Sequence, residues 1–351
     1  MSAALIDAWK EYRWLLAFLL TVMLGQLAFA IGQGATVSSF LTIAGQLLQF
    51  KILLIIGFFG ATVLALFIRA FIRARKTGGK TIPLFDQAVG DFFTWPRMVR
   101  GFVGLQAYFV IVLIIALGKS LIPYVQPYSW DVAISVLDFK IHGGQYPYEL
   151  FSYWFKSVNF FAFFNFVYTM WFGVMFGVNA WVLFCEPEKR MRQHFMWAVS
   201  IAWVILGIGA ASCFSSVGPI YFGHYYPEIA NPYLGLMDIL RHIHEQHELN
   251  VMKVAGMLLG LMEDNEVLGV NGISAMPSMH VAVTVLITLY AFSRSRIAGI
   301  ISAIYTICIM IGSVVLAWHY ALDGYVSIVA VLFIWFAVGA VVNKLHKNYE
   351  K

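Results

Sequence analysis

Eight long stretches of this sequence consist almost entirely of apolar residues. They run from Trp14 to Gly32, Ile52 to Ile72, Phe102 to Ile122, Phe160 to Phe184, Met196 to Phe214, Pro277 to Phe292, Ile297 to Trp318, and Tyr325 to Val342. A bilayer offers no water to pair with backbone amides and carbonyls, so a chain that crosses it there has to be helical. With 61% hydrophobic and 12% charged residues, the chain could not cover its surface with polar groups in water. The sequence predicts an all-α polytopic membrane protein with about eight transmembrane helices.

The lysines and arginines predict how these helices are oriented. If the N-terminus is cytosolic, 17 of the 23 basic residues fall on the cytosolic side, and the other six are Lys51, Lys119, Lys140, Lys156, Arg241 and Lys253. Basic residues concentrate in cytosolic loops, so both termini are expected in the cytosol. The net charge of +5 then reflects topology and anionic lipids, and no basic soluble segment indicates nucleic-acid binding.

The first apolar stretch has a second interpretation as a signal peptide, because Ala28-Phe29-Ala30 imitates a cleavage site. Its length and the charge pattern favour a transmembrane helix. The three cysteines lie in or at the ends of three different spans and predict no disulfide and no zinc site. No asparagine begins an N-x-Ser/Thr sequon, which favours a bacterial plasma membrane.

Two polar loops are expected on the outer, periplasmic face. The loop from Pro123 to Ser157 is too broken to span, and we expect a short interfacial helix and a turn in it. The loop from Val217 to Met276 is far longer than usual, and its part from Tyr233 to Met262 has the periodicity of helices lying on the membrane surface. Within it, His244 and His247 invite a metal interpretation, but the zinc-protease spacing is absent, and a solvated helix face or a pH-sensitive patch is the simpler explanation.

The segment Gly272 to Ala282, "GISAMPSMHVA", places polar residues directly before an apolar helix. We expect Pro277 in the first turn of that helix and Ser274, or another small residue, at its cap. Ser278 and His280 would then lie in the first turn, where free backbone amides and the helix dipole attract an anion such as phosphate.

A second segment, "AWHYALDGY" from Ala317 to Tyr325, follows the seventh span on the same outer face. His319 and Asp323 are four residues apart, so on a helix the carboxylate can fix one imidazole nitrogen and leave the other nucleophilic. A single membrane histidine can be a satisfied core residue. Three ionisable residues at two helix ends on one face indicate a functional site instead.

The motifs "SAMPSMH" and "HYALD" resemble the second and third signature motifs of the type-2 phosphatidic acid phosphatase superfamily, whose core has six helices. The resemblance implies that His319 is the nucleophile that forms a phosphohistidine, His280 the general acid and later base, and Asp323 the residue that orients His319. Ser278 would hydrogen-bond a phosphoryl oxygen, and Gly218 and Tyr320 are further substrate-binding candidates. The scheme needs no metal and no cofactor. Residues 101–351 would form the catalytic core, and residues 1–100 two additional helices with a basic cytosolic loop.

The chain also departs from the family pattern. It has no Arg-Pro, the corresponding place reads "FSSVGPIYFG", and Gly312-Ser313 stand where the family has Ser-Arg. Lys119, Lys140, Lys156 or Arg241 could supply the missing charge, and the glycines Gly143, Gly144 and Gly218 could present backbone amides; ordinary turns explain the glycines equally well. A phosphodiester carries less charge than a monoester, so a site with fewer arginines is better suited to it.

These features favour transfer of a phosphorylated head group from a phospholipid to a lipid acceptor, as in the inositol phosphorylceramide synthase-like branch, which the chain resembles most. Two alternatives remain open at this point. A lipid or polyprenyl phosphate phosphatase would use water as the acceptor, and a non-catalytic transporter or channel would not need His319. The sequence shows no two-halves symmetry in favour of transport.

Overall fold

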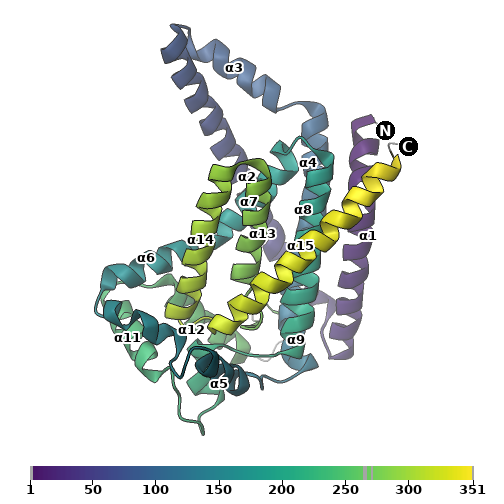
Figure 1. The fold of residues 1–351 in the computed structure, drawn as a ribbon. Helices are drawn as coiled ribbons and strands as arrows, with labels where there is room; N and C mark the ends of the chain where they lie inside the picture. Colours follow the sequence, from purple (N-terminus) through teal and green to yellow (C-terminus); the bar gives the residue numbers. More distant parts are fainter. Residues whose placement is uncertain (1–2, 264–266, 270–271, 350–351) are drawn as a thin grey trace.

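Long helices running side by side make up most of the molecule, and several short helices gather at one end (Figure 1). The structure, a computed structural model, describes residues 3–263, 267–269 and 272–349. Within these ranges it contains helices and connecting turns and no strand. The predicted all-α architecture of a polytopic membrane protein is confirmed.

Seven helical segments among the described residues, some made of consecutive helices, are long and apolar enough to cross a membrane. They are α1 (Ala3–Gly32), α2 (Val37–Thr77), α4 (Trp95–Val125), α6 with α7 (Val158–Thr169 and Trp171–Cys185), α8 continuing through the π-helical η2 into α9 (Lys189–Ala202, Trp203–Ala210 and Ala211–Cys213), α14 (Arg296–Val315) and α15 (Ala321–Tyr349). The remaining predicted span, Pro277 to Phe292, corresponds to the shorter apolar helix α13 (Met279–Arg294).

Two predicted spans differ from the helices that form. α2 begins at Val37 rather than near Ile52, because Thr36 and Ser39 form a reciprocal capping box in which each hydroxyl accepts the other's backbone N–H. The sequence analysis left out the first part of α2, because the polar residues that follow Val37 make it less apolar than a typical transmembrane span. The predicted fourth span is divided at Met170 into α6 and α7.

Helix α13 lies in the middle of the bundle and packs against α14, α15, α8 and α7 (Figure 1). From Met279 to Ile287 all its residues except His280 are buried. At about 1.5 Å per residue, its 16 residues span about 24 Å, less than the hydrocarbon thickness of about 30 Å. With Arg294 at one interface, the other end of α13 is recessed within the bundle.

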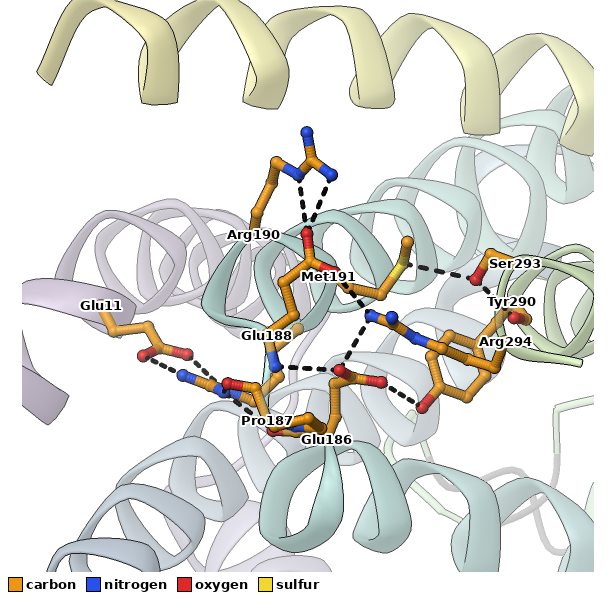
Figure 2. A network of polar contacts seen from close by, with 10 residues as sticks. Glu11, Glu186, Pro187, Glu188, Arg190, Met191, Tyr290, Ser293 and Arg294 are labelled. Carbon is orange, nitrogen blue, oxygen red and sulfur yellow. Dashed lines mark hydrogen bonds and ion pairs between the residues drawn. The ribbon is translucent and has the colours of Figure 1, made fainter. Parts of the chain in front are cut away.

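α1 begins and α15 ends at the same end of the bundle, which also carries α3 (Thr81–Phe92) and the link between α7 and α8 (Figure 1). A network of ion pairs joins α1, this link and α13 there (Figure 2). Arg192 donates two hydrogen bonds of 2.8 Å to the carboxylate of Glu11. Glu186 accepts hydrogen bonds of 2.8 Å from Arg294 and from the hydroxyl of Tyr290. These contacts tie four helices together at the end of the molecule that carries the termini.

The opposite end holds the two long loops and their short helices. These are α5 (Asp131–Ile141), η1 (Pro147–Trp154), η3 (Pro219–Tyr221), α10 (Phe222–Tyr225), α11 (Leu234–Gln246) and α12 (Asn250–Glu263). α5 is the short helix expected in the first loop, and it ends in a turn where Gly143 and Gly144 have φ of 70° and 84°. The helical region expected from Tyr233 to Met262 forms as α11 and α12. Residues 264–266 and 270–271 of this loop lie outside the described residues.

Candidate active site

His319 lies in a tight turn between α14 and α15. The carbonyl of Ser313 accepts hydrogen bonds of 3.0 Å from the amides of both Trp318 and His319. Ala317 has a φ of 61°, a left-handed conformation that costs energy for any residue with a side chain. Its carbonyl accepts a hydrogen bond of 2.8 Å from the amide of Ile220. The turn is thus held by contacts within α14 and with the long loop.

The imidazole of His319 is oriented by two acceptors on the same nitrogen. Its Nδ1 lies 2.8 Å from the carbonyl oxygen of Ala275 and 3.2 Å from Oδ2 of Asp323. A carbonyl can only accept a hydrogen bond, so Nδ1 carries the proton. The neutral ring therefore has an unprotonated Nε2, which is the form that a nucleophilic histidine requires.

Asp323 is completely buried in the first turn of α15. Its Oδ2 also accepts the backbone N–H of Tyr320 at 3.0 Å, and its carbonyl oxygen accepts the amide of Ser278 at 3.2 Å. The predicted contact between His319 and Asp323 is present, but the expectation that both lie on one helix is wrong. α15 begins at Ala321, because the turn after α14 has to reverse the chain before a helix can start.

His280 is the second residue of α13, and its ring faces the ring of His319 at 5.8 Å between centroids. Tyr168 stacks on one side of the His280 ring at 4.3 Å, and Trp171 lies at 4.2 Å. The indole N–H of Trp171 donates to the carbonyl of His280 at 3.0 Å. The two imidazoles are therefore close enough for one small group to contact both. The ring contacts with Tyr168 and Trp171 and the hydrogen bond from Trp171 fix the position of His280.

The N-cap and first turn of α13 differ from the prediction. Ser278 is the N-cap, and its hydroxyl accepts the amide of Val281 at 3.4 Å. Pro277 precedes the cap instead of occupying the first turn, and Ser274 is not the cap. Ser278 is fully buried, and its hydroxyl proton is not used by this cap, since the oxygen only accepts there.

The loops around the histidines depend on Asp131, whose role the sequence analysis missed. Its buried carboxylate accepts hydrogen bonds from the amides of Val217 and Gly218 and from the hydroxyls of Tyr226 and Tyr320, at 2.8 to 3.1 Å. Burial raises the pKa of Asp131, and these donors oppose that shift by favouring the carboxylate. Asp131 thus joins the loop after α9 to the residue that follows His319.

Two of the predicted substrate-binding residues are partners of this carboxylate. The amide of Gly218 and the hydroxyl of Tyr320 both donate to Asp131. Gly218 has a φ of 84°, and a side chain there would collide with the carbonyl oxygen of Trp318. The structure therefore requires glycine at this position for close packing beneath the His319 turn.

Asp138 performs the corresponding task for α15. Its carboxylate accepts the amides of Ala321 and Leu322 at 3.0 and 3.1 Å and so caps the helix that carries Asp323. Asp131 and Asp138 are seven residues apart, which places them on one face of α5. That spacing is a sequence signal that could have identified both residues.

The histidines of α11 form hydrogen bonds within the loop. Nδ1 of His244 accepts the backbone N–H of Leu249 at 2.9 Å, and Nε2 of His242 lies 2.8 Å from the side-chain Nε2 of Gln246. Among the described residues, no group of three or more His, Cys, Asp or Glu side chains is arranged to hold a metal ion. His244 therefore helps the chain to turn from α11 into α12.

A comparison with protein families decides the classification. The family model described as the PAP2 superfamily matches residues 132–337, more than half of the chain and all of His280, His319 and Asp323. The chain belongs to the PAP2 superfamily. This confirms the resemblance carried by the two histidine motifs and identifies a lipid enzyme of the phosphatase or phosphotransferase type that is integral to a membrane. Searches of curated proteins and of solved structures gave no match.

In this PAP2 protein, the residues at the missing Ser-Arg positions are structural. The hydroxyl of Ser313 donates to the carbonyl of Met310 at 2.8 Å, and its own carbonyl holds the His319 turn. Gly312 lies beside the rings of Phe164 and Tyr168. The segment in the place of Arg-Pro also lies at the site, because Ser216 accepts the amides of Ala275 and Met276.

Proposed function

We propose that this protein transfers a phosphorylated head group from a phospholipid to a lipid acceptor through a phosphohistidine at His319. The proposal rests on one arrangement: Nδ1 of His319 is held by Ala275 and Asp323, Nε2 has no hydrogen-bond partner among the described residues, and the ring of His280 lies 5.8 Å away between centroids. No described residue donates to or accepts from a ring nitrogen of His280, which suits a group that exchanges protons with a substrate.

The reaction takes two displacements. Nε2 of His319 attacks phosphorus, the bond from phosphorus to the departing alcohol oxygen breaks, and His280 gives that oxygen a proton. The unprotonated His280 then takes the proton of the acceptor hydroxyl, whose oxygen attacks phosphorus as the P–N bond breaks. Asp323 stabilises the positive charge that develops on His319 in the first step. Ser278 donates its hydroxyl proton to a phosphoryl oxygen, while Gly218 and Tyr320 keep the surrounding loop in place.

Two features favour a lipid acceptor over water. The end of α13 that carries His280 is recessed within the bundle, and α12 covers the loop beside it through an apolar cluster containing Val217, Tyr221, Ala255, Ile273 and Trp318. On the outer side of α12, Val254 and Met257 are 41% and 56% exposed, as expected for a helix at a lipid surface.

The missing arginines suit a singly charged phosphodiester donor, as in the inositol phosphorylceramide synthase-like branch.

We further propose that the reaction takes place on the outer leaflet of a bacterial plasma membrane. The basic residues cluster at the end of the bundle that carries both termini, and such clusters remain in the cytosol. The site lies at the other end. Cysteine accessibility to a membrane-impermeant reagent, at a residue introduced in α11 and at one introduced near the C-terminus, tests this orientation.

Trapping with a phospholipid labelled in its phosphate tests the chemistry. The purified protein should acquire an acid-labile, base-stable label, and His319→Ala should acquire none and lose turnover while remaining folded. Label that moves to a second lipid indicates a transferase, and label released as free phosphate or a phosphorylated head group indicates hydrolysis. Normal turnover by His319→Ala would refute the mechanism and leave transport as the remaining alternative.

A further inference from the structure

The phosphoryl group of the substrate needs a cation, and this end of the molecule offers several. Lys140 and Lys156 are exposed to the surroundings, and Arg241 is 58% exposed and pairs with Asp238 at 2.9 Å. Lys253 pairs with Glu248. Lys119 is different because it is only partly exposed and forms no hydrogen bond or ion pair with any described residue.

Lys119 is tied to the site through the backbone. Its neighbour Ser120 donates to the carbonyl of Gly269, and Gly272 packs directly against the main chain of Lys119, where any side chain would collide. Three residues further on, the carbonyl of Ala275 holds Nδ1 of His319. The Lys119 ammonium is also one of the charges that act electrostatically on His280. The segment from Gly272 to Ala275 therefore connects the main chain of Lys119 to the residue that holds His319.

Tyr168 supplies a second unused donor. Its side chain is 5% exposed, its ring stacks on His280 with an angle of 17°, and its hydroxyl has no hydrogen-bond partner among the described residues. The ring also packs beside Gly312, next to the position where the family carries its arginine. A buried hydroxyl without a partner costs about 1–3 kcal/mol. An unpaired hydroxyl beside His280 is therefore well placed to bind a ligand.

We propose that the Lys119 ammonium and the Tyr168 hydroxyl bind the phosphoryl oxygens of the substrate in place of the missing arginines. This assignment rests on the proposed function. Lys119 neutralises one negative charge and Tyr168 donates to an uncharged or shared oxygen, which matches a phosphodiester, because a phosphomonoester close to a dianion would keep a second charge unpaired. The pair thus makes the site selective for diesters.

The test measures binding and turnover separately on the full-length protein in detergent. The binding probe is orthovanadate, followed by thermal unfolding, and the turnover probes are bis(4-nitrophenyl) phosphate and 4-nitrophenyl phosphate. Lys119→Met should weaken vanadate binding and lower kcat/KM for the diester by about 10- to 100-fold, and Lys119→Arg should restore much of both. Tyr168→Phe should lower kcat/KM by about 3- to 10-fold without lowering thermal stability.

The matched control is Lys140→Met, an exposed lysine at the same end, which should change neither measurement. If wild-type protein binds vanadate and Lys119→Met binds it equally well, the assignment of Lys119 is wrong while the phosphohistidine mechanism stands. A Tyr168→Phe variant that loses stability but keeps kcat/KM would show that Tyr168 has only a packing role. If the wild type neither binds vanadate nor cleaves either ester, the proposed function and this assignment both fail.

Discussion

The buried polar groups at the two ends of this molecule have different surroundings. At the end that carries the termini, the buried charges Glu11, Arg192 and Glu186 form hydrogen-bonded ion pairs (Figure 2). The hydroxyl of Tyr12 and Nε of Arg100 have no partner there among the described residues. At the other end, the hydroxyl of Tyr168, the indole N–H of Trp318 and Oδ1 of Asp323 likewise have no described partner, but these groups surround the two facing histidines. Burying a polar group without a partner costs free energy, and we propose that a substrate pairs with the donors left unpaired beside the histidines.

The paired polar groups at the first end are expected to stabilise the fold, and the unpaired groups beside the histidines are expected to serve function. Removing one member of a paired group should destabilise the fold and leave catalysis per folded molecule unchanged. Removing an unpaired group should do the reverse. Side chains at each end can be changed to test whether this division holds.

The largest effect on stability is expected for Arg192→Met. Arg192 is 3% exposed and makes two hydrogen bonds with Glu11, so its loss leaves a buried carboxylate unpaired. Such changes cost about 3–5 kcal/mol. Chemical unfolding of the purified protein in detergent should show this loss, with kcat of the folded fraction unchanged. The double variant Arg192→Met, Glu11→Leu removes both charges and should recover most of the stability; no recovery would mean that Arg192 acts through its bonds to the carbonyls of Glu186 and Pro187 instead.

The next largest effect is expected at the other end, on rate. Asp323→Asn keeps an oxygen that can accept from Tyr320 and His319, and Ala275 still holds Nδ1, so the tautomer of His319 is retained. What is lost is the negative charge that, in the proposed mechanism, stabilises the phosphorylated imidazole. We expect kcat to fall by about a hundredfold or more, equivalent to about 2.7 kcal/mol, with little change in thermal unfolding. A rate within a fewfold of wild type would remove the stabilising role of the Asp323 charge.

The sequence predicts the contact between the motif residues at this end better than the backbone that carries them. The four-residue spacing of His319 and Asp323 correctly predicts their contact, yet it suggests a shared helix that does not form. The reason is the carbonyl of Ser313, which binds two successive amides, and the left-handed Ala317, which together reverse the chain before α15 starts. A single helical spacing carries no information about such a turn.

Contacts between distant segments are the part that sequence patterns could not supply. Asp131 binds the amide of Gly218, 87 residues further along the chain, and only tertiary packing brings them together. Likewise, four basic residues could have served the phosphate by sequence, and burial alone distinguishes Lys119 from the exposed Lys140 and Lys156. The membrane helices, in contrast, follow from local hydrophobicity because the bilayer leaves the backbone no other structure.

Two buried tyrosines of the site end provide a finer comparison. The hydroxyl of Tyr320 donates to Asp131 at 2.9 Å, whereas that of Tyr168 has no partner among the described residues. Tyr320→Phe should therefore cost about 1–2 kcal/mol of stability, because it removes a hydrogen bond to a buried carboxylate. Tyr168→Phe, described above, should cost none. Equal stability losses in parallel unfolding experiments would contradict the distinction between structural and functional hydroxyls.

The smallest effect is expected for Arg190→Ala, two residues from Arg192. Arg190 pairs with Glu188 at 2.9 Å, but their side chains are 51% and 37% exposed, so solvent screens the pair and Glu188 keeps a second partner in Arg294. Exposed pairs contribute about 0–1 kcal/mol, and this contribution should shrink further as salt is added to the unfolding assay. Arg190 and Arg192 belong to the same helix and the same network (Figure 2). A loss for Arg190→Ala as large as that for Arg192→Met would mean that the number of charges, rather than their burial, stabilises this end of the molecule.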